Sequence, residues 1–204
     1  MTTKEFVLIE QRLLPSFPGF SINKKLMFIC PITDILRGFH FEPSAFSKKA
    51  FYVDVFFMPL YVPAKQIHFT FGHRVGVGKC WNADLPGLGT ELQAEMKSEL
   101  PMLLNLGTPK NIVRALESFA NRKNPHSIEA FAYALIRAKE FTEAAKAIAT
   151  LLNVIDTRIT WQREIGARTQ LIKERLATDP RDACKQLNAW QSETTTNLGV
   201  DRFC

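Results

Sequence analysis

One apolar run limits the folds open to this chain more than any other feature. Residues 51–63, FYVDVFFMPLYVP, contain a single acid, Asp54. The run is shorter than the ~18–20 apolar residues that span a bilayer, so it does not predict a membrane helix. Alternate residues of a strand face opposite sides, and here both alternating sets are mainly apolar. The run therefore predicts a central strand that is covered on both faces.

Further apolar runs surround this strand and are separated from it by turn residues. The connections are too short for helical crossovers, so neighbouring strands are expected to pair antiparallel. Residues 3–14 carry apolar side chains at spacings of three and four, which predicts an amphipathic helix before the sheet. We therefore expect a helix and a four- or five-stranded antiparallel sheet. The predicted strands are Leu26–Cys30, Ile35–Phe41, Phe51–Val62 and Ile67–Phe71.

The second half of the chain has helical periodicity, and glycines between residues 76 and 89 mark the change. The fold class expected is α+β. Residues 1–87 form a helix plus antiparallel sheet and residues 88–204 an α-helical subdomain, packed together as one unit. The tail TTTNLGVDRFC (194–204) is expected to be loosely held. The predicted helices cover residues 90–105, 109–121, 126–137, 140–154, 157–177 and 180–191.

Composition indicates the compartment and excludes some classes of site. Four cysteines lie far apart with no CxxC pair, which favours reduced thiols over a disulfide framework or zinc ribbon. The start MTTKEFVLIEQ lacks the pattern of a signal peptide. We therefore expect a cytoplasmic protein that does not enter a membrane. The formal charge of +6 is mild, and no dense Lys/Arg block marks a phosphate track.

The glycine-rich stretch GHRVGVGKCW (72–81) invites comparison with nucleotide-binding loops. A P-loop has four residues between its first glycine and its Gly-Lys pair, and this pair is followed by Ser or Thr and then by a helix. Here five residues precede Gly78-Lys79, and Cys80 replaces the hydroxyl residue. The stretch therefore predicts a connection between sheet and helices, and we expect no bound cofactor.

Histidines on the predicted sheet are the nearest approach to a catalytic group. His40 and His68 fall opposite the phenylalanine rows, and Asp54 shares that side if the registers allow. With Arg37 or Arg74 these residues could form a polar cluster for acid–base chemistry. The alternative is that they are solvent-facing residues of an open sheet.

Metal and catalytic motifs are not recognisable in the chain. His68 and His73 would face opposite sides of one strand, so they share a metal ion only if the chain turns between them. No G-x-S-x-G, HExxH or Cys–His arrangement occurs, and no catalytic or metal-ligating residues are assigned. Arg74 and Trp81 are the candidate anchors for a partner, since they flank flexible glycines. The alternative for Trp81 is that it fills the interface between sheet and helices.

Two resemblances add expectations about architecture and setting. IEAFAYALIRAKEFTEAAKAIATLL (128–152) resembles one tetratricopeptide-type helical hairpin, but no second copy follows at a 34-residue period. A generic helical hairpin therefore fits better than a repeat array. The first 75 residues, through KEFVLIEQRLLPSFPGFSINKK and FYVDVFFMPLYVP, resemble small bacterial helix-plus-antiparallel-sheet domains of unknown function found beside toxin and defence genes. That resemblance implies no catalytic residues.

Together these observations favour a non-enzymatic bacterial protein-binding module, with an immunity or defence-associated role implied by the resemblance. Its expected partner is another protein, and a homodimer stays open. The alternative is a nucleic-acid-binding protein that uses its mildly basic surface, and the third hypothesis is an enzyme with a His/Asp cluster on the sheet. The interaction candidates are Arg37, His40, Asp54, His68, His73, Arg74 and Trp81.

Overall fold

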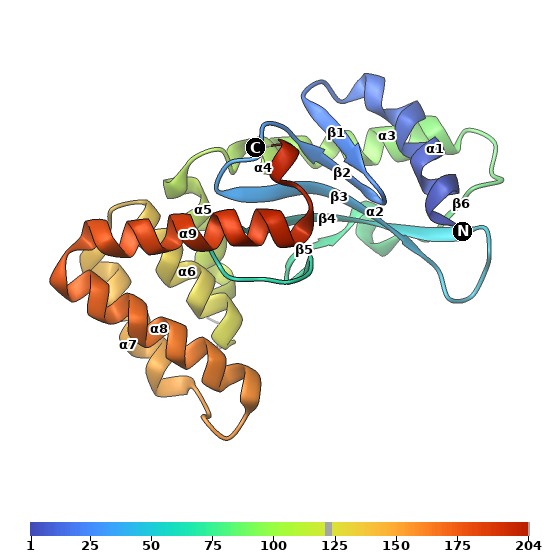
Figure 1. Ribbon diagram of the computed structural model, residues 1–204. Coiled ribbons are helices and arrows are strands. Elements are labelled where there is room, and N and C mark those ends of the chain that lie inside the picture. Colours follow the sequence, from blue (N-terminus) through green and yellow to red (C-terminus); the bar gives the residue numbers. More distant parts are fainter. Residues whose placement is uncertain (121–123, 204) are drawn as a thin grey trace. The chain divides into compact units, whose positions relative to one another are not determined.

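The computed structural model describes residues 1–120 and 124–203. It confirms the α+β class, with an N-terminal helix, an antiparallel sheet and then several helices (Figure 1). Two compact units divide the chain and are described separately below. Unit 1 comprises Met1–Met58, His68–Leu104 and the end of the chain from Arg202, and unit 2 comprises Pro59–Ile67 and Asn105–Asp201.

The sheet of unit 1 is a meander in which strands adjacent in sequence are adjacent in space. Its order is β1-β2-β3-β4-β5, and the short β6 also pairs with β4. Short turns join β1 to β2 and β2 to β3, as expected of antiparallel neighbours. The strands are β1 (Phe20–Asn23), β2 (Leu26–Ile29), β3 (Ile35–Pro43), β4 (Ala50–Pro59), β5 (Phe71–Arg74) and β6 (Trp81–Asn82).

The strand predictions need correction in three respects. The sequence did not predict β1 or β6, and the strand expected at Ile67–Phe71 begins only at Phe71. The central strand ends at Pro59 rather than Val62, because the chain beyond it bonds to a helix of unit 2 instead of to the sheet. There Thr194 Oγ1 accepts a hydrogen bond from the Ala64 N–H at 3.3 Å and donates one to the Val62 carbonyl at 3.4 Å.

The glycine-rich stretch is an excursion within one edge of the sheet. Both β5 and β6 pair antiparallel with β4, the first with residues 54–57 and the second with residues 50–51. They therefore act as one interrupted strand, with a turn labelled α2 (Val75–Gly78) between them. Gly72 has to be glycine, because a Cβ there would lie 2.2 Å from the Val55 carbonyl oxygen. The stretch thus lies within the sheet and does not link sheet to helices.

One face of the sheet carries an aromatic core that two helices cover. In Figure 1, α1 (Thr3–Leu13) and α3 (Leu88–Ser98) lie on the same side of it. A capping box between Thr2 and Glu5 starts α1. Phe6 of α1 packs between strand residues, with its ring 6.2 Å from that of Phe41 and 5.8 Å from that of Phe51. A short helix, α4 (Leu100–Asn105), adds Leu103 to the same core.

Unit 2 is helical and agrees closely with the predicted helices except at its end. Helix α9 continues seven residues past the expected 191, and Val200 is fully buried. The tail is therefore not loosely held, although Cys204 lies outside the described residues, as does residue 121 of the helix expected at 109–121. The helices are α5 (Pro109–Ala120), α6 (Pro125–Arg137), α7 (Phe141–Val154), α8 (Thr160–Thr178) and α9 (Pro180–Leu198).

The compact units do not follow the expected division at residue 87. Helices α3 and α4 group with the sheet, and residues 59–67 group with the helices. Compactness is not independent folding, so the domain division stays a prediction. Within residues 1–120 and 124–203, no helix has both the length and the apolar character needed to cross a bilayer.

Candidate functional site

The face of the sheet opposite the aromatic core carries a polar cluster centred on Arg74. Asp54 of β4 lies directly opposite Arg74 of β5, and the Arg74 Nε is 3.8 Å from the Asp54 Oδ1. Arg74 Nη2 donates a hydrogen bond to Glu42 Oε2 of β3 at 3.1 Å. The guanidinium carbon lies 3.8 Å from the ring centroid of Tyr52, within cation–π range. Residues from three strands, two of them carboxylates, therefore surround one arginine that lies over a tyrosine ring.

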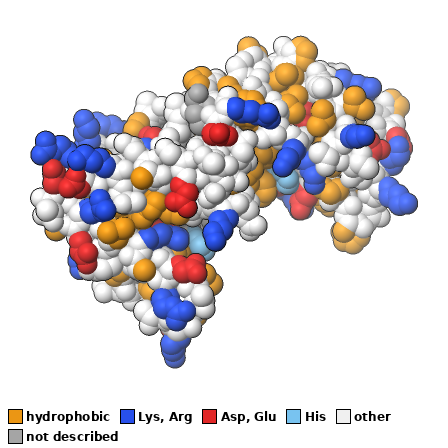
Figure 2. All heavy atoms as spheres, viewed as in Figure 1, with side chains coloured by type: hydrophobic (Ala, Val, Ile, Leu, Met, Phe, Trp, Pro, Cys, Tyr) orange, Lys and Arg blue, Asp and Glu red, His pale blue; other side chains and the backbone are white. Residues whose placement is uncertain are grey.

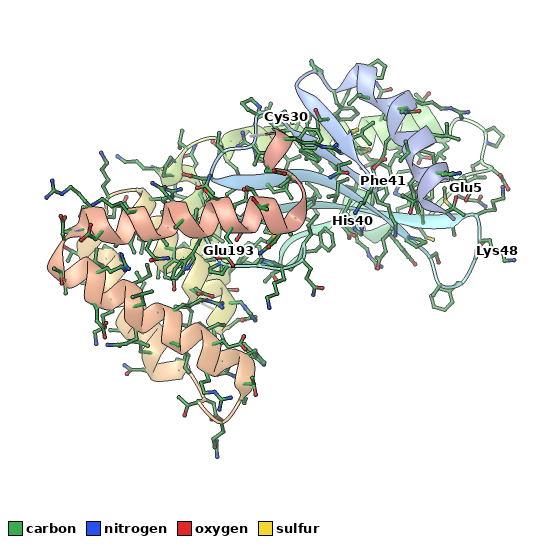
Figure 3. All side chains as sticks on the ribbon, in the orientation of Figure 1. Glu5, Cys30, His40, Phe41, Lys48 and Glu193 are labelled. Carbon is green, nitrogen blue, oxygen red and sulfur yellow. The ribbon has the colours of Figure 1, made fainter. Side chains whose placement is uncertain are left out.

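His40 extends this cluster across β3. Its Nδ1 is 3.5 Å from Asp54 Oδ2, an ion-pair distance that is too long for a well-formed hydrogen bond. The ring of Phe69 stacks on His40 with centroids 4.2 Å apart and planes 19° apart. Phe69 also meets Phe56 edge-on at 5.0 Å. Figure 3 labels His40 beside Phe41, which belongs to the opposite face of the same strand.

We call this set the sheet-face patch and define it by six side chains. Its two ends are solvent-accessible, since Arg74 is 45% exposed and Phe69 38% exposed. Its centre is more protected, with the His40 and Asp54 side chains at 18% and 17%. The patch thus exposes Arg74 and the ring of Phe69 to solvent, with the less exposed Asp54 and His40 between them. It consists of His40, Glu42, Tyr52, Asp54, Phe69 and Arg74.

The structure brings His40, Asp54 and Arg74 together on one face, which is part of the cluster that the sequence left open as one of two alternatives. Arg37 is on the other face of β3, where burial lowers the pKa of its guanidinium. His73 also faces away from the patch, and its Nε2 lies 3.0 Å from Glu99 Oε1 at the end of α3. His68 lies in the irregular segment before β5, with its ring 6.4 Å from that of Phe71.

Trp81 is a core residue and not a surface anchor. It is 1% exposed, belongs to the aromatic core and stands opposite Phe51 in the pairing of β6 with β4. The Lys79 ammonium lies 4.6 Å from its ring centroid and also pairs with Glu91. Trp81 therefore fixes the end of the glycine-rich turn, in line with the alternative that the sequence left open.

The patch has the groups for proton transfer but not those for holding a metal. A carboxylate beside an imidazole can orient that ring as an acid or base. Over the described parts of the chain, no three His, Cys, Asp or Glu side chains lie close enough to hold a metal ion. Three cavities lined by described residues lie elsewhere: one of about 340 Å³ between α1 and the start of α3, and two of about 580 and 530 Å³ in unit 2.

Several basic side chains of unit 2 are already neutralised by acids. Arg168 donates two hydrogen bonds to Glu129, which is fully buried. Arg158 pairs with Asp156 at 2.7 Å, and Arg181 with Asp179 at 3.0 Å. In Figure 2 blue and red side chains are interspersed on the visible face of this unit. This pattern differs from the continuous basic track that binds phosphates.

Sequence reasoning missed several residues that now matter. The sequence analysis placed Phe69 and Tyr52 in strands without a role at a surface, and it placed Glu42 just after a strand predicted to end at Phe41, whereas β3 extends to Pro43. Their positions two residues from Asp54 and His40 are the signal that could have found them, because side chains i and i+2 share a face. The larger cavity of unit 2 was not anticipated at all.

Comparison with known proteins adds no identity to these observations. No protein-family model matches the chain, and neither a curated protein nor a solved structure matches it.

Proposed function

We propose that this chain is a protein-binding module and that the sheet-face patch is its contact surface. The observation that carries the proposal is the exposed Arg74 lying 3.8 Å above Tyr52 with Glu42 holding its guanidinium. Arginine and tyrosine are enriched among the residues that dominate protein interfaces. Ordering such side chains before binding reduces the entropy lost on association. The patch is thus suited to receive a partner without rearrangement.

Stability alone gives a weak reason for this arrangement. Ion pairs as exposed as that of Arg74 and Glu42 contribute about 0–1 kcal/mol to folding. The solvent-exposed part of the Phe69 side chain makes no packing contact that would stabilise the core. Recognition supplies a reason for keeping an arginine, a tyrosine and a phenylalanine together at a surface.

The setting is a further part of this proposal. A bacterial immunity or defence role rests on the resemblance of the first 75 residues alone. A cytoplasmic location rests on the wide spacing of the cysteines.

Two other functions remain as alternatives with less support. Nucleic-acid binding draws on the formal charge of +6, but Arg158 and Arg168 are committed to carboxylates. An enzyme draws support from the 3.5 Å approach of His40 and Asp54. We favour binding over catalysis because that pair lies beside an exposed arginine and an exposed aromatic ring, as is common at protein interfaces.

A photo-crosslinking experiment tests the proposal. A benzophenone amino acid replaces Tyr52 in the patch and, as the control, Trp161, an exposed aromatic residue of α8. Each full-length variant is irradiated in extract of the source cells, with and without nuclease. We expect a defined protein adduct from position 52 that resists nuclease and is absent from position 161.

The opposite outcomes are equally clear. Equal adduct patterns from both positions, or adducts that disappear after nuclease treatment, would contradict the proposal. The nuclease result would favour the nucleic-acid alternative instead.

A further inference from the structure

A second surface, in unit 2, has the form of a binding groove. Helix α6 packs against both α5 and α7, and the three helices line a cavity of about 580 Å³. Its floor is formed by Ile128, Phe131 and Leu135, which share one side of α6 at spacings of three and four. The first and last of them are seven positions apart, or about 10 Å along the helix axis. We call this surface the helical groove.

The floor offers apolar surface to an occupant. Ile128 and Leu135 are buried at 4% and 2% exposure, whereas Phe131 between them is only partly buried. Val113 of α5 is also partly exposed and lines the same cavity. An occupant that covers Phe131 and Val113 therefore removes apolar area from water, which favours binding.

The walls of the helical groove carry charges in a definite order. Short connections make α6 antiparallel to α5 and α7, so the first turns of α5 and α7 lie at the same end, near Leu135. At that end the α5 wall is basic and the α7 wall acidic. At the other end, near Ile128, the order is reversed. The six exposed charges are Lys110, Arg114 and Glu117 on the α5 side, and Glu140, Glu143 and Lys146 on the α7 side, where Lys146 donates a hydrogen bond to Glu143 at 2.7 Å.

This order of charges has a two-fold symmetry that restricts the occupant. Turning an elongated occupant end for end exchanges its two flanks and also its two ends, so a matching charge pattern matches again. An occupant that carries the opposite charge at every position is repelled by the walls in both orientations. The walls therefore select the pattern of charges on a partner but not its direction.

We propose that the helical groove binds an amphipathic α-helix of a partner protein. Its apolar stripe, at spacings of three and four, covers Phe131 over about two turns. Its flanks place acids toward Lys110 and Arg114 and bases toward Glu140 and Glu143, with the signs reversed at the other end. A helix fits because its two flanks face the parallel walls while its stripe faces the floor. This site is separate from the sheet-face patch and does not depend on it.

Two designed peptides test this proposal on the full-length protein. Both are helical, about 14 residues long, with the same leucine stripe and the same composition, and Lys and Glu are exchanged between them. Fluorescence anisotropy at low salt should give the matched peptide a Kd on the order of 10 µM and the exchanged peptide one about tenfold weaker. The difference should shrink at 0.5 M salt, because exposed charges are screened.

Substitutions in the protein locate the binding. Phe131→Ala should weaken the matched peptide about tenfold or more. Because this change alters the packing of α6, a second variant uses exposed positions only: Lys110→Glu, Arg114→Glu and Glu117→Lys reverse the α5 wall. That variant should lose its preference between the peptides, since its two walls now favour opposite patterns, while Arg163→Ala, an exposed change on α8, should keep it.

The proposal is overturned if neither peptide binds, or if both bind equally to the unaltered protein. It is also overturned if reversal of the α5 wall leaves the preference unchanged, because the peptide would then bind elsewhere.

Discussion

Each of the two units contains an arginine that pairs with a glutamate, but the two pairs differ in their exposure to solvent. In unit 1, Arg74 and Glu42 are both 45% exposed and lie on the open face of a sheet. In unit 2, Arg168 is 20% exposed and its partner Glu129 is fully buried between helices. Both pairs join an arginine to a glutamate, through two hydrogen bonds in unit 2 and through one in unit 1. The larger difference is their access to water.

That difference separates residues that hold the fold from residues that are free to bind. A buried carboxylate whose arginine is removed has no water to replace it, so the pair is needed for the structure. An exposed arginine can be lost and its acids resolvated at small cost. We therefore expect Arg74 to be dispensable for stability, and this is why we propose that it serves recognition.

A third carboxyl group extends the comparison. Glu10 of α1 is fully buried like Glu129, yet neither of its oxygens has a hydrogen-bond partner among the described residues. Burial raises its pKa from 4.5 to about 8. A buried negative charge is costly. Glu129 offsets this cost by pairing with Arg168, whereas Glu10 avoids it because its raised pKa favours the neutral form.

The largest effect is expected in unit 2. Arg168→Ala should destabilise the protein by about 3–5 kcal/mol, because Glu129 would be left charged and buried. Chemical denaturation measures this as a lower midpoint. Replacing both residues by methionine should restore most of the loss, since an apolar pair of similar volume has no charge to bury. If Arg168→Ala lowers the free energy of unfolding by less than about 1 kcal/mol, the buried and exposed arginines would not differ in their importance for stability.

Glu10→Gln should change the pH dependence of stability by a few kcal/mol. The folded-state pKa of about 8 lies above the ordinary 4.5, so the folded protein binds this proton more tightly than the unfolded chain. The contribution of Glu10 is therefore fully present below about pH 4.5 and is lost as the pH rises to about 8. Glutamine cannot ionise, so the variant should lack this decline in denaturation midpoints between pH 5 and 9. A parallel decline in both proteins would show that Glu10 is ionised and paired.

Asp54→Ala is expected to have a smaller effect, of about 1 kcal/mol. The Asp54 carboxylate is 17% exposed and lies near both Arg74 and His40, so its removal leaves two cationic or polar groups without a neighbour. The melting temperature should fall by about 2–4 °C. An unchanged melting temperature would mean that Asp54 simply faces water.

Arg74→Ala should have the smallest effect on stability, below about 1 kcal/mol. Glu42 is already 45% exposed and water can replace its lost hydrogen bond. Denaturation midpoints of this variant and the unaltered protein should nearly coincide. A loss comparable to that of Arg168→Ala would make Arg74 a structural residue and weaken its assignment to recognition.

Local patterns were enough to predict the central strand, although not its end. Two apolar faces identify residues 51–62 as a covered strand, whereas the observed strand covers residues 50–59. The sequence left open whether Asp54 and Arg74 share a face. Register is a property of two strands together, so the sequence did not show that Asp54 stands opposite Arg74. It likewise did not show that Phe69 leaves the sheet to stack on His40.

Features that depend on packing between helices were out of reach. Glu129 and Arg168 are 39 residues apart on different helices, and neither position is unusual by itself. Arg168 is one of several basic residues of α8, and its spacing along the chain does not show that it pairs with Glu129. The helical groove requires three helices to be placed side by side, and only then do its charges form a pattern.

The central claim, that Arg74 serves recognition, is tested most directly by affinity for the protein that crosslinks at position 52. Its Kd is measured with the purified partner for Arg74→Ala and for Arg163→Ala, an exposed arginine of α8, at 50 and 200 mM salt. We predict a loss of tenfold or more for Arg74→Ala at both salt concentrations and a change below about twofold for Arg163→Ala. Equal losses for the two variants, with a steep fall in affinity between the two salt concentrations, would contradict the account.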